Sequence, residues 1–198
     1  MGYFMIFNNS KPIKASFHGH DNFCGIVENF FLASTIDCIA WTSAVMIPKT
    51  IFNTIGGFNE NMRSVQDTDL WIRIALKYKV AFCSKPTAYK VIRNEENHLS
   101  NYAFKYDGAD IYKNFKNEEE QNHPLKKYLD LNRFSMAIEC KINGDKENYK
   151  ILKKSIDENH LNYKQKLLLK TPKTGLIFLK KIQIWFIMKN IYMTPFKN

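Results

Sequence analysis

The sequence lacks several features that would identify a common class of protein. Its four cysteines stand far apart, with no Cys-x-x-Cys pair and no close cysteine and histidine cluster, which excludes the usual zinc sites. No stretch reaches the ~18 uninterrupted apolar residues of a membrane-spanning helix. The apolar start, residues 1–7, has no preceding positive charge and is not typical of a signal peptide. We therefore expect reduced thiols, a cytoplasmic location and no membrane crossing.

Acidic residues are absent after Glu158, whereas eight lysines follow Leu161. These lysines account for most of the net charge of +10, so the part of the chain before them is nearly neutral. A charge this localised indicates an interaction of the C-terminal segment rather than of the whole surface. That segment lacks arginine, and the sequence contains no recognisable nucleic-acid-binding module. We expect no nucleic-acid partner.

Hydrophobic residues make up 45% of the 198 positions, which is enough to bury a core. Their pattern predicts strands at 2–7, 41–47, 80–84 and 88–93, and short helices at 25–32 and 48–55. Gly56 and Gly57 end the second of these helices. A longer amphipathic helix begins near Asp67, and its expected buried face consists of Leu70, Trp71, Ile74, Ala75 and Tyr78. The order of elements predicts a mixed α/β fold.

The second half of the chain is helical and rich in lysine. Helices at 129–142 and 146–156 are expected to form a hairpin around Asn143-Gly144-Asp145. The polar residues 117–122 are typical of a solvated linker. We therefore divide the chain into an α/β part at 1–115, a helical hairpin at 116–160 and a basic amphipathic tail at 161–198.

The most informative motif runs from Thr42 to Arg73. It contains Thr-Ser-Ala-Val-Met-Ile-Pro-Lys, then Gly-Gly-Phe-Asn-Glu, then Gln-Asp-Thr-Asp-Leu-Trp-Ile-Arg. In order and spacing these segments resemble the family-2 glycosyltransferases of the GT-A type, over roughly residues 1–100. The resemblance implies part of a GT-A domain, a Rossmann-like mixed sheet, followed by a C-terminal α-helical region. It implies an inverting enzyme that transfers a sugar from a nucleotide-sugar donor to a saccharide or lipid-linked acceptor in cell-surface polysaccharide synthesis.

Asp67 is the expected catalytic residue. Inverting transfer needs a carboxylate that takes the proton from the acceptor hydroxyl as it attacks the anomeric carbon. The resemblance assigns this role to Asp67, although Gln66 stands where the family has glutamate. The alternative is that Ser64-x-x-Asp67 is a variant capping box, in which the carboxylate serves free backbone N–H groups. The two roles are compatible, because a helix N-terminus also favours an ionised carboxylate.

Further residues of the motif are candidates for substrate binding. Gly57 and Phe58 are expected to shape the acceptor pocket, unless they are a plain turn and a core aromatic residue. Asp69 belongs either to the acceptor site or to the first helical turn alone, and Trp71 and Arg73 are expected to pack and pair within the domain. The remaining substrate-binding candidates are Ser43, Gln66 and Arg93, the last as a partner of phosphate oxygens. His98 is the candidate metal ligand, with a surface loop histidine as the alternative.

The chain has no Asp-x-Asp sequence upstream of Met46. In the family this sequence holds a divalent metal, Mg²⁺ or Mn²⁺, that bridges the donor diphosphate. The resemblance therefore implies that the complete enzyme binds the metal and the nucleotide-sugar. We expect no metal to bind to this chain by itself. We also expect it to be catalytically silent alone and to dock with a separate N-terminal half.

The tail has its own expected partner. Residues 167–193 combine lysines with apolar and aromatic residues, a pattern typical of an amphipathic helix on the anionic inner leaflet of the plasma membrane. The alternative is that the aromatic residues pack onto the helical hairpin and the lysines are merely solvated. A catalytically inactive remnant, acting as an interaction or membrane-associated protein, is the competing function.

Overall fold

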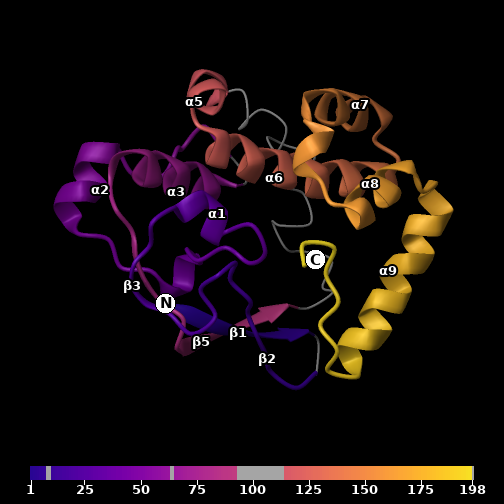
Figure 1. Cartoon of the computed structure of the whole chain (residues 1–198), viewed down its shortest axis with the longest axis horizontal. Coiled ribbons are helices and arrows are strands. Elements are labelled where there is room, and N and C mark those ends of the chain that lie inside the picture. Colours follow the sequence, from indigo (N-terminus) through magenta and orange to yellow (C-terminus); the bar gives the residue numbers. More distant parts are fainter. Residues whose placement is uncertain (8–9, 63–64, 93–113, 198) are drawn as a thin grey trace.

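The computed structural model describes residues 1–7, 10–62, 65–92 and 114–197. It is a mixed α/β structure, as the sequence predicts. Short strands lie on one side of the molecule, and most of the helices of the second half lie on the other (Figure 1). The last long helix runs along the margin and connects the two sides.

The first sheet has the strand order β2-β1-β5. Strand β1 (Gly2–Phe7) pairs antiparallel with β2 (Ile13–Lys14) and parallel with β5 (Pro86–Ile92). The predicted strand at 2–7 is confirmed, and the one predicted at 88–93 begins earlier, at Pro86. A Cβ atom at Gly2 would lie 2.3 Å from the carbonyl oxygen of Ser84, so only glycine fits at this position.

Two of the sequence predictions in this part are wrong. Residues 25–32 contain strand β3 (Cys24–Ile26) and then the short helix α1 (Phe30–Ala33), because β3 pairs with the distant β4 (Ala81–Cys83). Residues 41–47 contain a 3-10 helix, η1 (Thr42–Ala44), and no strand. Both edges of β1 are already occupied by β2 and β5, so the apolar 41–47 segment packs through side chains instead.

The helices that carry the motif agree with prediction. Helix α2 (Lys49–Ile55) follows Pro48 and ends at Gly56, which has the left-handed φ of 87° expected of a helix C-terminus. Helix α3 spans Gln66–Lys77, and Leu70 and Trp71 of its predicted face are buried. The predicted face is only partly correct, because Ile74, Ala75 and Tyr78 are half-buried and Ile72 is buried instead. The strand predicted at 80–84 is β4.

The helical half begins with α5 (Lys116–Gln121), where the sequence predicted a linker at 117–122. This prediction is wrong because Glu119 forms a bidentate ion pair with Arg133, which stabilises the polar segment as a helix. The predicted hairpin is confirmed as α6 (His123–Asn143) and α7 (Lys146–Ser155). Between them Gly144 has a φ of 83°, and Asp145 caps α7. The 3-10 helix η4 (Glu158–His160), α8 (Tyr163–Lys170) and α9 (Lys173–Met188) follow.

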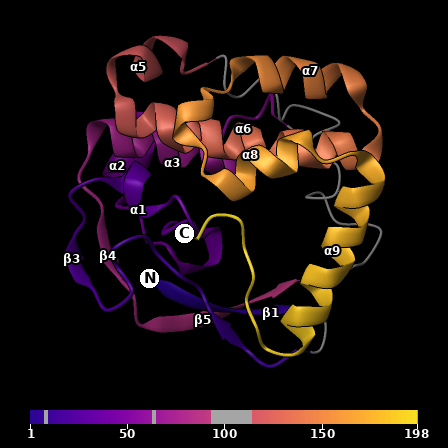
Figure 2. The ribbon, with the colours of Figure 1, turned by 45° about the vertical axis from the view of Figure 1, so that its right-hand side comes forward.

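The two halves share apolar contacts. Tyr128 of α6 packs against Phe30 and Phe31 of α1, with ring centroids 6.3 and 5.8 Å apart. One hydrophobic cluster contains buried residues from Tyr3 to Leu169, and α6 lies next to α1 (Figure 2). The division into parts at residues 115 and 160 stays a prediction, although the core is continuous across the first boundary.

Candidate functional site

Arg73 joins the two halves of the predicted motif. Its Nη1 donates to the carbonyl of Ile55 at 2.8 Å, and its Nη2 donates to the carbonyl of Gly57 at 2.6 Å. Its Nε donates to Asp69 Oδ2 at 2.8 Å, and the Asp69 side chain is only 5% exposed. The guanidinium therefore satisfies carbonyls at the C-terminus of α2 while it pairs with a carboxylate of α3. The Gly-Gly-Phe turn is fixed to α3 by this one side chain.

The turn itself has aromatic neighbours. Gly57 has a φ of 58°, and a Cβ atom there would lie 3.2 Å from the ring of Phe52. Phe58 is 43% exposed and makes edge contacts with the rings of Phe52 and Trp71. The indole Nε1 of Trp71 is buried and has no hydrogen-bond partner among the described residues. The turn thus presents an accessible aromatic ring beside a buried one.

Asp67 lies in the first turn of α3 and is half-buried. Its Oδ2 accepts a hydrogen bond from the hydroxyl of Thr42 at 3.3 Å, and its Oδ1 accepts one from the backbone N–H of Thr68 at 2.7 Å. The N-cap of α3 is Val65, with a φ of 57° and no capping side chain. The carboxylate therefore serves one free N–H of the helix start, and it also receives a hydroxyl from η1. Ser43, the next residue of η1, is exposed, and Gln66 is half-buried.

The predicted site residues fall into two groups. Asp67 and Asp69 are two positions apart, which on a helix turns their side chains about 200° from each other. Asp69 lines a pocket of about 560 Å³ together with Phe58, Asn59, Glu60, Arg73, Phe115 and Glu118. Asp67 faces Thr42 and does not line this pocket. The structure brings Phe58, Gly57 and Asp69 together but separates them from Asp67.

Asp67 and Asp69 match a metal-binding Asp-x-Asp motif in sequence but not in geometry, because the Asp69 carboxylate is paired with Arg73. Within residues 1–7, 10–62, 65–92 and 114–197, no group of three or more potential ligands could hold a metal ion. Arg93 and His98 lie outside the described residues, so their predicted roles stay predictions.

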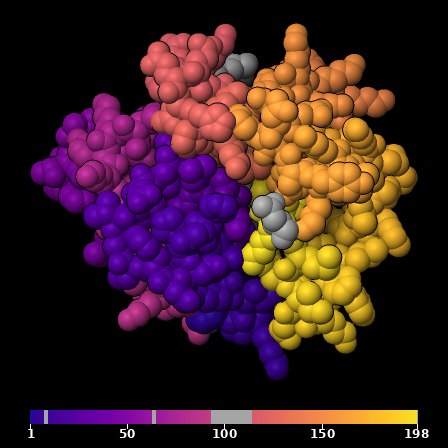
Figure 3. All heavy atoms as spheres, viewed as in Figure 1, coloured from indigo at the N-terminus to yellow at the C-terminus, as the bar shows by residue number. Residues whose placement is uncertain are grey.

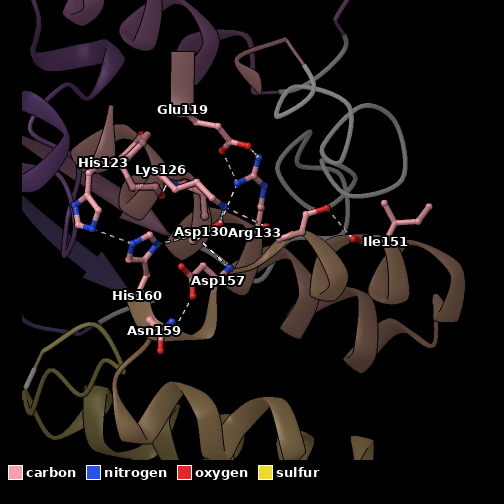
Figure 4. Close-up of polar contacts among 12 residues, drawn as sticks. Glu119, His123, Lys126, Asp130, Arg133, Ile151, Asp157, Asn159 and His160 are labelled. Carbon is pink, nitrogen blue, oxygen red and sulfur yellow. Dashed lines mark hydrogen bonds and ion pairs between the residues drawn. The ribbon is translucent and has the colours of Figure 1, made fainter. Parts of the chain in front are cut away.

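A polar network centred on Asp130 was not predicted. Asp130 is fully buried in α6, where its Oδ1 accepts from Lys126 Nζ at 2.7 Å and Arg133 Nη1 at 2.9 Å. Its Oδ2 lies 2.7 Å from His160 Nδ1 and accepts the backbone N–H of Asp157 at 3.3 Å. Figure 4 shows these groups converging from α5, α6 and η4. The network fixes η4 against α6.

The network reaches the surface through two histidines. His160 Nε2 lies 3.2 Å from His123 Nε2, at a pocket of about 750 Å³ that Glu119, Lys126 and Asp157 also line. Because the two nitrogens face each other, one ring donates and the other accepts, so the contact contains a single proton. Asp130 orients His160 in this pair. No short sequence pattern signals the network, because its members are up to 41 positions apart.

The tail forms two helices where the sequence predicted one over 167–193, because α8 ends at Lys170 and Pro172 precedes α9. Leu176 and Ile187 of α9 are buried, whereas Phe178 and Trp185 are 63% and 57% exposed. The aromatic residues therefore pack onto the hairpin only in part. An apolar cavity of about 630 Å³ lies between α6, α8, α9 and the C-terminal segment. No helix in the described part of the chain is long and apolar enough to cross a membrane.

Comparison of the chain with protein-family models, with curated proteins and with solved structures found no match. The resemblance of the Thr42 to Arg73 motif to family-2 glycosyltransferases therefore stays a prediction from the sequence.

Proposed function

We propose that this chain is the acceptor-side part of an inverting, nucleotide-sugar-dependent glycosyltransferase, with a GT-A type domain and Asp67 as its general base. The observation that carries the proposal is the unit formed by the Gly-Gly-Phe turn and α3. Arg73 fixes the turn to the helix, and the same helix presents the half-buried Asp67 carboxylate at its N-terminus. A motif recognised in the sequence thus corresponds to one connected piece of structure.

The chemistry asked of Asp67 is a single proton transfer. The acceptor hydroxyl forms a bond to the anomeric carbon, the bond from that carbon to the diphosphate breaks, and Asp67 takes the hydroxyl proton. The backbone N–H of Thr68 and the hydroxyl of Thr42 donate to the carboxylate and orient it before the reaction. Because Asp69 is already paired with Arg73, it acts in this proposal as a positioning residue rather than as a direct acceptor contact.

The other ligands of the reaction belong to the complete enzyme in this proposal. The described residues do not fit a divalent metal, so Mg²⁺ or Mn²⁺ and the nucleotide-sugar would bind to a separate N-terminal half. The reacting hydroxyl of the saccharide or lipid-linked acceptor would bind at Asp67, beside Thr42. Phe58 lies apart from Asp67, so its exposed ring would contact a part of the acceptor that is distant from this hydroxyl.

The test is transfer of labelled sugar from UDP-, GDP- and dTDP-sugars to a saccharide and lipid acceptor fraction, with the nucleotide-binding half supplied in trans. Asp67→Asn should lower turnover on the order of 10²-fold or more while donor binding changes little. Glu147→Gln is the matched control, because Glu147 is also an acid in the first turn of a helix, α7, and should leave turnover unchanged. Near-normal turnover of Asp67→Asn would reduce Asp67 to a helix-capping residue.

A second candidate function, a membrane-associated interaction protein without catalysis, is favoured by the outer face of α9. Phe178, Lys181, Trp185, Met188 and Lys189 follow helical spacing, and all are exposed. Aromatic residues flanked by lysines suit the interface of an anionic lipid surface, where each lysine contributes ~1 kcal/mol. We propose the cytoplasmic leaflet as the location of this contact for either function.

Co-sedimentation with vesicles tests the membrane contact. The chain should sediment with vesicles containing phosphatidylserine and be released by salt, because charges on a surface are screened over ~10 Å at 0.1 M ionic strength. Trp185→Ser should weaken sedimentation, whereas Tyr163→Ser, an 80% exposed aromatic on α8, should not. Equal binding to neutral and anionic vesicles would contradict the electrostatic part of the proposal.

A further inference from the structure

Two cysteines that are far apart in the sequence lie opposite each other in the β3–β4 ladder. Cys24 of β3 pairs with Cys83 of β4 in the antiparallel register. The backbone N–H of Ser84 donates to Phe23 at 2.8 Å, and that of Val27 donates to Val80 at 2.9 Å. Hydrogen-bonded pairs alternate with non-hydrogen-bonded pairs along such a ladder. The Cys24 and Cys83 pair therefore occupies a non-hydrogen-bonded position.

This position brings the two side chains close together. Opposite residues of a non-hydrogen-bonded pair have Cα atoms about 4.5 Å apart, and disulfides form when Cα atoms are about 4.4–6.8 Å apart. Both side chains point to the same face of the two-stranded sheet, because directly opposite residues share a face. No rearrangement of the backbone is needed to join them.

The two thiols are also accessible and unequal. Cys24 is exposed and Cys83 is partly exposed. Hydrogen bonding to Cys24 lowers the pKa of the Cys83 thiol, and the backbone N–H of Lys85 lowers it further. The same contact with Cys83 raises the pKa of the Cys24 thiol. Cys83 therefore loses its proton more readily than Cys24 does, and the thiolate is the reactive form of cysteine.

The other two cysteines have thiols with raised pKa values and have no cysteine opposite them in the described sheets. Cys140 is fully buried in α6, and burial raises the pKa of its thiol to about 11. Burial also raises the pKa of Cys38, whose sulfur lies 3.5 Å from the carbonyl oxygen of Ala40. Neither lies opposite a second cysteine in the described ladders. They serve as internal references for the reactivity of the β3–β4 pair.

We propose that Cys24 and Cys83 form a dithiol–disulfide site that reacts with small disulfides of the glutathione class. The Cys83 thiolate attacks one sulfur of the oxidised glutathione, whose S–S bond breaks, and one glutathione leaves as a thiolate that takes up a proton. Cys24 loses its proton and attacks the Cys83 sulfur of the mixed disulfide, and the second glutathione leaves as a thiol. The protein dithiol is oxidised, and one glutathione disulfide is reduced to two thiols.

The bond would have a consequence for the motif that carries the proposed function, although the disulfide site does not depend on that function. The chain between Cys24 and Cys83 contains η1, α2 and the whole of α3. A disulfide would close this segment into a loop and restrict its unfolded states. The oxidised protein should therefore resist proteolysis in this segment more than the reduced protein does.

Thiol counting tests the proposal on the intact chain. After incubation with oxidised glutathione, acid quenching and unfolding, alkylation should modify only two of the four cysteines. A peptide map should contain one linked peptide pair that joins Cys24 to Cys83, and a reductant should restore all four thiols. Cys24→Ser should instead retain one glutathione on Cys83, because the resolving thiol is missing.

Thiol counting on the chain without substitutions tests the proposal even if the Cys24→Ser variant folds poorly. Four alkylated cysteines after oxidation would overturn the proposal. So would a linkage that involves Cys38, Cys140 or a second copy of the chain.

Discussion

Two regions of this molecule are each organised around an ion pair between a buried aspartate and an arginine on the same helix. The two arginines contact different additional groups. In α3, Asp69 pairs with Arg73, whose other N–H groups go to backbone carbonyls of Ile55 and Gly57. In α6, Asp130 pairs with Arg133, whose other N–H groups go to the Glu119 carboxylate. The first pair fixes a turn, and the second joins three helical elements.

The difference lies in how much charge each aspartate compensates. Among the described residues Asp69 has one cationic partner, and that partner is 25% exposed. Asp130 is not exposed at all and contacts Lys126, Arg133 and His160. Because a buried charge without its partner is costly, the two sites should respond to the same substitution with different losses of stability.

The largest expected effect is therefore at Asp130. Asp130→Asn should lower the free energy of unfolding by about 3–5 kcal/mol. The substitution removes the carboxylate that both Lys126 and Arg133 contact inside the protein. Asp69→Asn should cost about 1.5–3 kcal/mol, the worth of a hydrogen bond to a charged group. Urea unfolding of both variants measures the difference. Equal losses would show that the extra cations around Asp130 contribute nothing.

A smaller effect is expected from Arg73→Lys. A lysine cannot contact Asp69, Ile55 and Gly57 at the same time, and each lost hydrogen bond is worth about 1 kcal/mol, so we expect a loss of about 2 kcal/mol. Lys77→Arg, an exchange of the same two residue types at an exposed position of α3, is the control and should be neutral. If Arg73→Lys is equally neutral, the turn is fixed by its aromatic contacts instead.

Losses of equal or smaller size are expected at the left-handed glycines of the two regions. Gly57→Ala should cost about 2 kcal/mol and Gly144→Ala about 1 kcal/mol, within the strain expected for a left-handed residue with a Cβ atom. At Gly57 the new Cβ would lie 3.2 Å from the Phe52 ring, whereas at Gly144 the nearest atom is the mobile Lys173 Nζ at 3.4 Å. Thermal unfolding of both variants would rank them, and a larger loss at Gly144 would contradict this argument.

The sequence predicted those parts of the fold that have a local signal. Strand β1, the end of α2 at Gly56, helix α3 and the α6–α7 turn at Gly144 all follow from residues within a few positions of one another. Strand β3 and helix α5 were missed, because β3 depends on β4 and α5 depends on Arg133. Apolar residues at 41–47 favoured a strand, but this segment packs into the core through its side chains and adds no strand to the described sheets.

The candidate site follows the same rule. The pairing of Arg73 within the domain was expected from the motif, and the position of Asp67 at a helix start was also expected. The separation of Asp67 from Asp69 follows from their spacing on the helix. The contact of Asp67 with Thr42 could not be derived, because it depends on how η1 packs against α3. The Asp130 network and the Cys24–Cys83 pair could not be predicted from the sequence for a similar reason. Their residues are far apart in the sequence and come into contact only in the folded chain.

The C-terminal segment affects how the protein folds during synthesis. The C-terminal segment returns to the N-terminal part of the chain, as the yellow and indigo regions of Figure 3 show. There the Tyr192 hydroxyl donates to Asp37 at 3.1 Å, across 155 positions of sequence. A ribosome releases the N-terminal residues long before Tyr192. The hydrogen bond between Tyr192 and Asp37 therefore forms only after almost all of the described chain has emerged. Because such long-range contacts form slowly, we expect the segment around Asp37 to be less protected than the β1–β5 and β3–β4 pairings until translation is nearly finished.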